Sequence, residues 1–470
     1  MHPPSAFVTV PQVQCFDLVS RILKLLNWDE SQLETRDMER HQGPRRKILT
    51  WQIIVGLIAH ALPFAGRFSQ CLRQFFGMTL SDSALSQRRA QLGTDLFLLI
   101  MRETLRPLAV AHLHPGCFFG ALRLLGIDGT RWSVGNTPQH LARILKAKTR
   151  RGSAAFAKIS MSALVELGTH APLHATLGLD GQSEQVLSVP LFEGLPPQSL
   201  LILDRLYGQA PMLDELQAHC AAAKEQHYLV RVRARLAVQV RTQLADGSAL
   251  VEVALRDKLK QRLVLKTLVV REVRGRVWSR AQNQWVEVRL WTSLSVEQAG
   301  AAPLIELYAR RWEQEVFYRE LKLQVARGEL LQSHTPETAQ QEIAALLMAC
   351  TLVAQERLAV AAEAGGEVQA AGVVRISLSI CLEQTQALWL VLSAAQGLMD
   401  EAAQRELVRR MRAQIAACAL PPRRPRSCER KVRQPVTQWR RMIAPISVTS
   451  PAAYEVTQMK SPRLLHGIGA

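Results

Sequence analysis

The sequence predicts an α/β protein whose mixed core is interrupted by an all-β segment and flanked by helical regions at both ends. Helical periodicity dominates residues 1–110 and 337–415, apolar runs typical of buried strands appear between residues 118 and 230, and β-branched runs with turn signals fill residues 230–295. The chain has 470 residues, of which 48% are hydrophobic. That is enough for buried cores in two to four domains of roughly 100–200 residues each.

The charge balance predicts a polyanionic partner. The chain carries 58 Lys and Arg against 40 Asp and Glu, a net charge of +18, which favours nucleic acid or an acidic membrane surface. No run reaches the ~18 uninterrupted apolar residues of a membrane span, and residues 343–354 are expected to form a buried helix. No charged-then-apolar leader begins the chain, so we expect no secretion signal. The 8 cysteines lie without a CxxC pair, which argues against a zinc module or a disulfide framework.

Most of the excess positive charge lies in two segments. Residues 230–280 hold 13 Lys and Arg against 4 acidic residues, and residues 421–442 hold 8 against 1. In the first segment apolar and polar residues alternate from Val230 to Arg241, which predicts one half-buried strand with a basic exposed face. Asp246-Gly247 then indicates a hairpin. The exposed face is either an ordinary solvated surface or a surface that follows phosphates. The second segment is expected to be a flexible basic arm.

The N-terminal region contains helical patterns and one arrangement typical of DNA readers. The short helix ending at Phe76 and the one capped by Ser81 resemble a helix-turn-helix, with Arg88 and Arg89 on the second helix. A plain helical bundle produces the same pattern. The expected helices are Val13–Leu26, Lys47–His60, Phe68–Phe76 and a fourth ending at Leu92.

Two strand-like runs of the core end in an aspartate, at Asp128 and at Asp204. A carboxylate at the end of a buried strand pays a desolvation cost unless a cation meets it, and a hard divalent cation is one such partner. Either aspartate alone is more often an ordinary turn residue.

The helix expected over Pro303–Val325 supplies a third carboxylate. Tyr308, Arg311, Glu315 and Lys322 fall within a sector of ~60° at about 100° per residue, so one face presents a carboxylate, two cations and a phenol. A solvated face with charged pairs is the alternative for such a helix in isolation. Glu313 and Glu320 lie off this sector and are expected to face solvent. A strand-end histidine such as His170 is expected to be structural.

These residues resemble the bacterial insertion-sequence DDE transposases of the family-four type. The resemblance rests on Asp128-Gly129-Thr130, on Asp204 followed by Tyr207, on the spacing Tyr-x2-Arg-x3-Glu-x6-Lys from Tyr308, and on the segment 163–171. It covers roughly residues 118–330. Two departures stand out. The family often has Gly two residues after the second aspartate, where this chain has Leu206. Trp285 and Trp291 both miss the offset of the tryptophan that stacks a base in hairpin-forming members.

The resemblance implies an RNase H-like catalytic core with a β-rich insertion between the second aspartate and the glutamate. It implies that Asp128, Asp204 and Glu315 bind two Mg²⁺ ions, which Mn²⁺ can replace, for in-line phosphoryl transfer. Tyr308, Arg311 and Lys322 are then expected to hold the phosphates beside the scissile bond. We add Arg231, Arg233, Arg88 and Arg89 as expected DNA contacts.

The expected organisation follows from these assignments. An N-terminal DNA-recognition region (1–117) precedes the first part of the core (118–229), the β-rich insertion (230–295), the core helix with the catalytic glutamate (296–335), a helical C-terminal region (336–420) and a basic tail (421–470).

The expected function is that of a DNA transposase. It would act on terminal inverted repeats and target DNA as a homodimer in the synaptic complex, away from membranes, in the bacterial cytoplasm near the nucleoid. The alternatives are an inactive transposase-derived repressor, an RNase H-like nuclease without strand transfer, and membrane-surface binding through residues 421–442.

Overall fold

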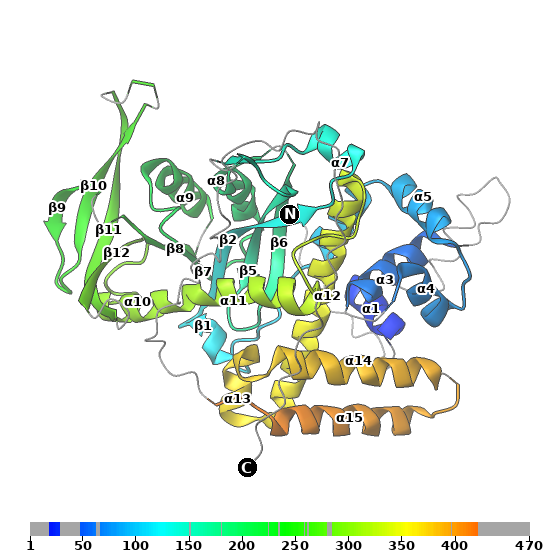
Figure 1. The fold of residues 1–470 in the computed structure, drawn as a ribbon. Helices are drawn as coiled ribbons and strands as arrows, with labels where there is room; N and C mark the ends of the chain where they lie inside the picture. Colours follow the sequence, from blue (N-terminus) through cyan, green and yellow to red (C-terminus); the bar gives the residue numbers. More distant parts are fainter. Residues whose placement is uncertain are drawn as a thin grey trace, which may run out of the picture. The chain divides into compact units, whose positions relative to one another are not determined.

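The computed structural model of the chain (Figure 1) describes the residue ranges given at the end of this paragraph. Nearly all of them belong to one compact unit, and of the second unit only strand residues Ser279 and Gln284 are described. The expected start of the first helix at Val13 and nearly all of the basic arm 421–442 lie outside the described residues. The described ranges are 18–28, 48–62, 66–149, 152–179, 181–223, 225–233, 236–257, 259–260, 263–279, 284–395 and 397–421.

A mixed sheet of 10 strands forms the centre of the unit, in the order β6-β5-β2-β7-β8-β12-β11-β10-β9, with β1 beside β2. β6, β5 and β2 are antiparallel neighbours, whereas β7 and β8 run parallel to β2. The strands are β1 (Phe118–Phe119), β2 (Leu122–Val134), β5 (Ala157–Glu166), β6 (Ala171–Gly178), β7 (Ser199–Leu203), β8 (Gln226–Arg231), β9 (Gln239–Gln243), β10 (Ala249–Arg256), β11 (Val264–Ser279) and β12 (Gln284–Thr292); β3 (Lys148–Thr149) and β4 (Gly152–Ser153) form a separate pair.

Helices cover both faces of the parallel part of this sheet. All five residues of β7 are buried, as expected for a strand covered on both sides. Leu125 and Ile127 of β2 pack into the apolar cluster that contains α9, while Leu124 packs into the cluster that contains α10. Even-numbered side chains of β2 therefore face α10 and the helices that follow it. The elements on these faces are α8 (Glu184–Ser188), η2 (Val189–Gly194), α9 (Ala210–Ala222), α10 (Ala301–Tyr308), η3 (Ala309–Arg311), α11 (Trp312–Arg319) and the π-helical η4 (Glu320–Val325).

The single basic strand expected from Val230 to Arg241 is wrong. β8 ends at Arg231, and β9 begins only at Gln239. Between these two strands, the Arg289 guanidinium of β12 donates to the carbonyl oxygens of Arg233 (3.3 Å) and Leu236 (2.9 Å).

The hairpin at Asp246-Gly247 is confirmed between β9 and β10, with Gly247 at a φ of +82°. The β-rich segment continues the core sheet, because β12 pairs directly with β8.

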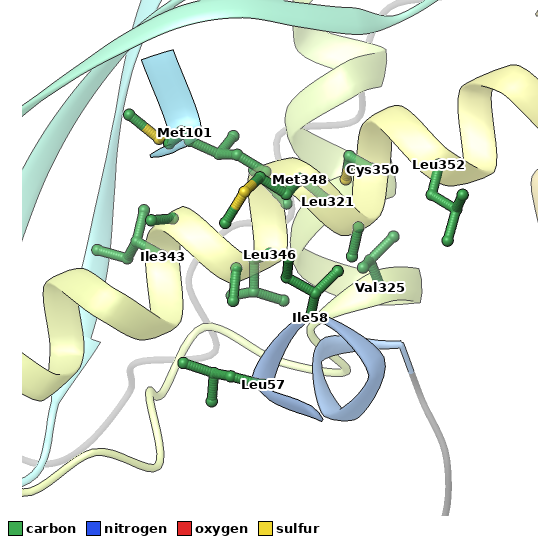
Figure 2. Close-up of a cluster of buried hydrophobic side chains, with 14 of the residues drawn as sticks. Leu57, Ile58, Met101, Leu321, Val325, Ile343, Leu346, Met348, Cys350 and Leu352 are labelled. Atoms are coloured by element: carbon green, nitrogen blue, oxygen red, sulfur yellow. The ribbon is translucent and has the colours of Figure 1, made fainter. Parts of the chain in front are cut away.

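The N-terminal helices pack on α12 (Pro336–Ala364) to form the largest core. Figure 2 shows Leu57 and Ile58 of α3 facing Leu346 of α12, with Leu321 and Val325 of η4 beside them. α12 is long and apolar enough to cross a membrane by length and composition, yet 89% of its most apolar window is buried inside the protein. The expected buried helix at 343–354 is thus confirmed. The N-terminal helices are α1 (Leu18–Leu26), α3 (Thr50–Ala61), α4 (Phe68–Phe76), α5 (Asp82–Leu92) and α6 (Asp95–Thr104).

A second helical layer lies at the far end of α12. Buried Glu356 of α12 accepts from Arg412 of α15 at 2.6 Å and also pairs with Arg21 of α1, so one carboxylate joins three helices. The six cysteines that the structure describes are free thiols. The remaining elements are η1 (Pro115–Cys117), α7 (Pro138–Arg143), α13 (Gly366–Ala370), η5 (Gly372–Arg375), α14 (Leu378–Ala394) and α15 (Glu401–Ala417).

Candidate active site

The two aspartates occupy matching positions on neighbouring parallel strands. β7 pairs with β2 up to Ile202 opposite Gly126, and Asp204 and Asp128 each follow two residues later. Neighbouring strands lie roughly 4.8 Å apart, and residues of the same parity share a face. Both carboxylates therefore belong to the sheet face that α10 and α11 cover, at the carboxyl ends of the strands.

The loop after Asp204 is fixed by its own backbone contacts. The Asp204 carboxylate accepts from the amide of Leu206 at 2.6 Å. A Cβ on Gly208 would lie 2.1 Å from the carbonyl oxygen of Arg231. The chain thus has a glycine where this loop touches the end of β8, two residues after Leu206.

Asp128 is held in an environment that disfavours its charge. Burial, the carboxylate of Glu184 and the carboxylate of Asp204 raise the pKa of Asp128 to about 7, although the Gly129 amide and Arg311 act against the shift. The amide of Gly129 donates to the Asp128 carboxylate at 2.9 Å. Several acidic groups crowded at the end of a buried strand are the arrangement that a divalent cation stabilises.

The helix carrying Glu315 runs across this face of the sheet (Figure 1). Gln314 donates to the carbonyl oxygen of Ala163 on β5 at 3.2 Å, and the Tyr318 hydroxyl donates to the carbonyl oxygen of Asp128. These two anchors fix the helix on both sides of Glu315. A Cβ on Gly126 would lie 2.7 Å from Gln314, so a glycine in β2 is needed for this close approach.

Of the four residues predicted to share a helix face, Arg311 and Tyr308 interact electrostatically with the aspartates, and Glu315 is joined to Arg311. Arg311 bonds Glu315 at 2.6 Å and also acts electrostatically on Asp128. Tyr308 is hydrogen-bonded to Arg231, and burial, the largest influence, raises the pKa of its phenol. The structure thus adds Arg231, from the end of β8, to the same neighbourhood.

Lys322 lies further along, on the π-helical turn η4. Its ammonium donates to the carbonyl oxygen of Arg131 at 2.8 Å, bonds Glu329 at 3.2 Å and lies over the ring of Trp132. A π-turn advances the chain by fewer degrees per residue than an α-turn, so the sector calculated for a regular helix does not hold at this position.

Glu313 and Glu320 do not face solvent, and that expectation is wrong. Glu313 accepts from the amide of Gly168 at 2.6 Å and pairs with Arg310. Glu320 bonds His170 at 2.7 Å and Arg357 at 3.2 Å. Although burial acts in the opposite direction, these cations lower the pKa of both carboxyls to about 2. Residues off the catalytic sector thus anchor the helix inside the protein, and His170 has the structural role expected of it.

Arg89, expected to contact DNA, is turned inward. Its guanidinium donates to the carbonyl oxygen of Thr338 at 2.9 Å and to the Ser333 hydroxyl at 3.3 Å, so it ties α5 to the start of α12. Arg88 bonds Thr50 of α3 at 3.1 Å. Arg233 is exposed.

Glu184 is a carboxylate near Asp128 that the sequence analysis did not single out. It opens the short helix α8, where Ser183 caps the helix and an acid in the first turn looks like ordinary capping chemistry. The hydroxyl of buried Tyr207 donates to Glu184 at 2.8 Å. No signal in the sequence links residue 184 to Asp128, because only the tertiary fold brings them together.

The carboxylates of the candidate site are of the chemical type that binds a divalent cation. They are too far apart in this structure to coordinate one ion together. Among the described residues, no group of three His, Cys, Asp or Glu side chains is close enough together to hold a metal ion. The acidic groups that act on Asp128 are nevertheless hard oxygen donors, which Mg²⁺ and Mn²⁺ prefer.

Residues 120–352 match the family model described as the transposase DDE domain, a range that contains Asp128, Asp204 and Glu315. The central region of the chain therefore matches a transposase DDE domain, in agreement with the resemblance seen in the sequence.

Among curated proteins, the transposase InsG for insertion sequence element IS4 of Escherichia coli (strain K12) is 25% identical over 283 residues, 60% of this chain and 62% of the relative. The putative transposase InsZ of the same organism is 24% identical over 181 residues, 37% of this chain and 60% of that protein. The chain thus spans about three fifths of the length of these relatives.

A cryo-EM structure of the piggyBac transposase synaptic complex with hairpin DNA aligns over 89% of this chain and 86% of its own, with a TM-score of 0.39 and 12% identity. That likeness is too weak to define a shared fold.

Proposed function

We propose that the protein is a DNA transposase that cuts the ends of an insertion sequence and joins them to target DNA. The observation that carries this proposal is the placement of Asp128 and Asp204 at matching ends of parallel strands, beneath the helix that bears Glu315. The β6-β5-β2-β7-β8 arrangement, with three antiparallel strands followed by two parallel ones, supports an RNase H-like core. The β-rich segment then extends that core between the second aspartate and the glutamate.

Asp128, Asp204 and Glu315 are the residues that would hold two Mg²⁺ ions, with Mn²⁺ as a substitute. Ions bound there supply an activated water and stabilise the departing 3′ oxygen of an in-line displacement. Glu315 is ion-paired with Arg311, and as the third carboxylate it would face the cation while Arg311 would bind the scissile phosphate. Tyr308 and Arg231 hold the neighbouring phosphate on the same side.

DNA binding is proposed for the exposed basic residues of the β-rich segment, with Arg233 as the representative. We also propose roles for the other regions of the chain. Residues 1–117 help to recognise terminal inverted repeats, and residues 336–420 contribute to dimerisation. The basic tail 421–470 adds phosphate contacts, and the protein acts on the bacterial nucleoid. Arg89 is not among the proposed contacts, because its guanidinium is bonded within the protein.

The test is Mg²⁺-dependent cleavage of a supercoiled plasmid that carries the genomic ends flanking the gene. Wild-type protein is expected to nick or break the end junctions, and Glu315→Gln is expected to bind the same ends and cut at least ~10²-fold more slowly. Glu306→Gln, which removes an exposed carboxylate from the preceding helix, is the matched control and is expected to cut normally.

The products separate the alternatives. Cut ends joined to a second plasmid support transposition, whereas cutting without joining supports an RNase H-like nuclease. End binding without cutting in either Mg²⁺ or Mn²⁺ contradicts the enzyme and favours a transposase-derived repressor.

A further inference from the structure

The helix that bears Glu315 is bonded to the backbone of the strands beneath it. The side-chain amide of Gln314 donates to the carbonyl oxygen of Ala163 at 3.2 Å, and the Tyr318 hydroxyl donates to the carbonyl oxygen of Asp128. Asp128 and Ala163 lie opposite each other in the pairing of β2 with β5. Two side chains from successive turns of α11 therefore bind one cross-strand pair, and this pair includes the first aspartate of the candidate site.

These two bonds fix both the position and the rotation of α11. Gln314 and Tyr318 are four residues apart, so they lie on one side of the helix, and Glu315 points about 60–100° away from them. Both side chains are buried, with exposed fractions of 1% for Gln314 and 8% for Tyr318. The helix can neither slide nor turn without breaking one of these bonds, and either movement would displace Glu315.

The strand beneath the helix leaves space for this contact. A Cβ on Gly126 would lie 2.7 Å from Oε1 of Gln314. Gly126 is two residues before Asp128, so both belong to the same face of β2. The close approach of the helix and the placement of the aspartate thus depend on the same short stretch of strand.

Buried polar side chains are a costly way to pack a helix unless they are hydrogen-bonded. The adjacent Val316 and Phe317 are buried apolar residues, and apolar packing is non-directional. Hydrogen bonds to two carbonyl oxygens of a sheet instead specify one position of the helix. Such precision matters at an active site, because a displacement of about 1 Å can cost about 100-fold in rate.

We propose that Tyr318 and Gln314 are positioning residues that hold the helix of Glu315 in place over the end of β2. This inference rests on the proposed function, because it takes Glu315 and Asp128 as residues of the active site. In this role Tyr318 and Gln314 act through Glu315 and touch neither the DNA nor the cation.

The experiment compares Tyr318→Phe with Tyr228→Phe in the full-length protein. Tyr318→Phe keeps the ring and removes the hydroxyl that binds the Asp128 carbonyl oxygen. Tyr228→Phe removes the hydroxyl of another buried tyrosine, on β8, and is the matched control.

We expect Tyr318→Phe to bind the plasmid with the genomic ends as tightly as the wild type and to cut it at least ~10-fold more slowly at saturating Mg²⁺. Gln314→Met, which keeps the length of the side chain and removes its amide, is expected to slow cutting in the same way. The control should bind and cut as the wild type does. A loss of cutting with full DNA affinity is a result that general destabilisation does not produce.

Hydrogen exchange followed by mass spectrometry tests the anchor without requiring activity. In Tyr318→Phe the amides of Trp312–Arg319 are expected to exchange about 2–10-fold faster than in the wild type, because one hydrogen bond that holds α11 is lost. In Tyr228→Phe the same amides should exchange at the wild-type rate.

The outcomes separate this inference from the proposed function. If the wild type cuts and Tyr318→Phe cuts equally fast, or if its α11 amides exchange at the wild-type rate, the inference is wrong and the proposed function stands. Equal slowing by the Tyr228→Phe control also overturns the inference. If the wild type does not cut, the proposed function is wrong and the positioning role is wrong with it.

Discussion

At the scale of single residues, protonation of Asp128 controls the charge of the site. Its folded pKa of about 7 lies well above its ordinary value of 3.8 because of burial and the neighbouring carboxylates of Glu184 and Asp204. A group whose pKa is raised on folding binds more protons in the native state between its two pKa values, so the free energy of unfolding rises as the pH falls from about 7 toward 3.8. Without a cation, ionisation of Asp128 lowers the free energy of unfolding.

Asp128→Asn is therefore expected to stabilise the cation-free protein at pH 8 by on the order of 1–3 kcal/mol. The difference from the wild type should shrink as the pH falls from 8 to 5, because the wild-type carboxyl becomes neutral. Urea unfolding in EDTA at each pH measures the difference in the free energy of unfolding between the two proteins. The other titrating groups are the same in both, so their contributions cancel. Equal stabilities of the two proteins at pH 8 would contradict the raised pKa.

Glu320 shows the opposite behaviour. Its carboxylate is paired with His170 and Arg357 inside the protein, and although burial opposes the shift, these cations lower its pKa to about 2. A lowered pKa contributes stability above the unfolded value near 4.5, which is lost as the pH falls toward 2. Glu320→Gln is expected to cost about 3–5 kcal/mol at pH 7, because it removes the buried carboxylate that is bonded to both His170 and Arg357.

The loss in Glu320→Gln should diminish as the pH falls from about 4.5 toward 2, because the carboxyl of the unfolded wild-type chain is protonated in this range whereas the folded carboxylate stays charged until about pH 2. Glu337→Gln breaks an exposed pair with Arg143 and serves as the control, with an expected change of about 0–1 kcal/mol in the free energy of unfolding. If the two variants lose the same free energy of unfolding, burial of the Glu320 ion pairs contributes nothing to stability.

At the scale of elements, two basic residues expected to bind DNA have different roles. Arg89 of α5 donates to the carbonyl oxygen of Thr338 and to Ser333 near the start of α12, whereas Arg233 lies exposed after β8. Position on an element, rather than residue type, decides whether an arginine supports packing or faces a partner.

Arg89→Gln is expected to lower the free energy of unfolding by about 1–3 kcal/mol, because buried acceptors lose their donor. Arg233→Gln should leave stability within about 0.5 kcal/mol of the wild type and weaken DNA binding instead. Urea unfolding and DNA-binding titrations of both variants measure this, and a reversed pattern would overturn the assignment.

At the scale of the whole molecule, the proposed association with DNA depends on the net charge of +18. Some of the basic residues form ion pairs inside the protein, as Arg271 does with Asp246 and Arg289 with Glu272. The exposed remainder is expected to release counterions on binding, so affinity should fall at least ~10-fold between about 50 and 200 mM salt. Fluorescence anisotropy with a labelled duplex measures it, and an affinity independent of salt would contradict the charge argument.

Several secondary-structure elements were predictable from the sequence. The helix ending at Phe76, the helix capped by Ser81, the hairpin at Asp246-Gly247 and the buried helix at 343–354 all appear where periodicity and capping chemistry place them. Such signals come from neighbours in the chain, which is why they can be read locally. The strand expected from Val230 to Arg241 is interrupted where a distant arginine, Arg289, bonds the backbone of the chain.

The sequence by itself determined the composition, the excess of positive charge, and the spacing of Asp128, Asp204 and Glu315 that resembles a transposase. Only the tertiary structure decided that the two aspartates stand at matching strand ends, that Glu184 lies against Gly129, and that Glu313 and Glu320 point inward. The physical reason is the separation along the chain. These contacts join residues dozens to more than a hundred positions apart, and their formation depends on sheet pairing and helix packing that no local periodicity encodes.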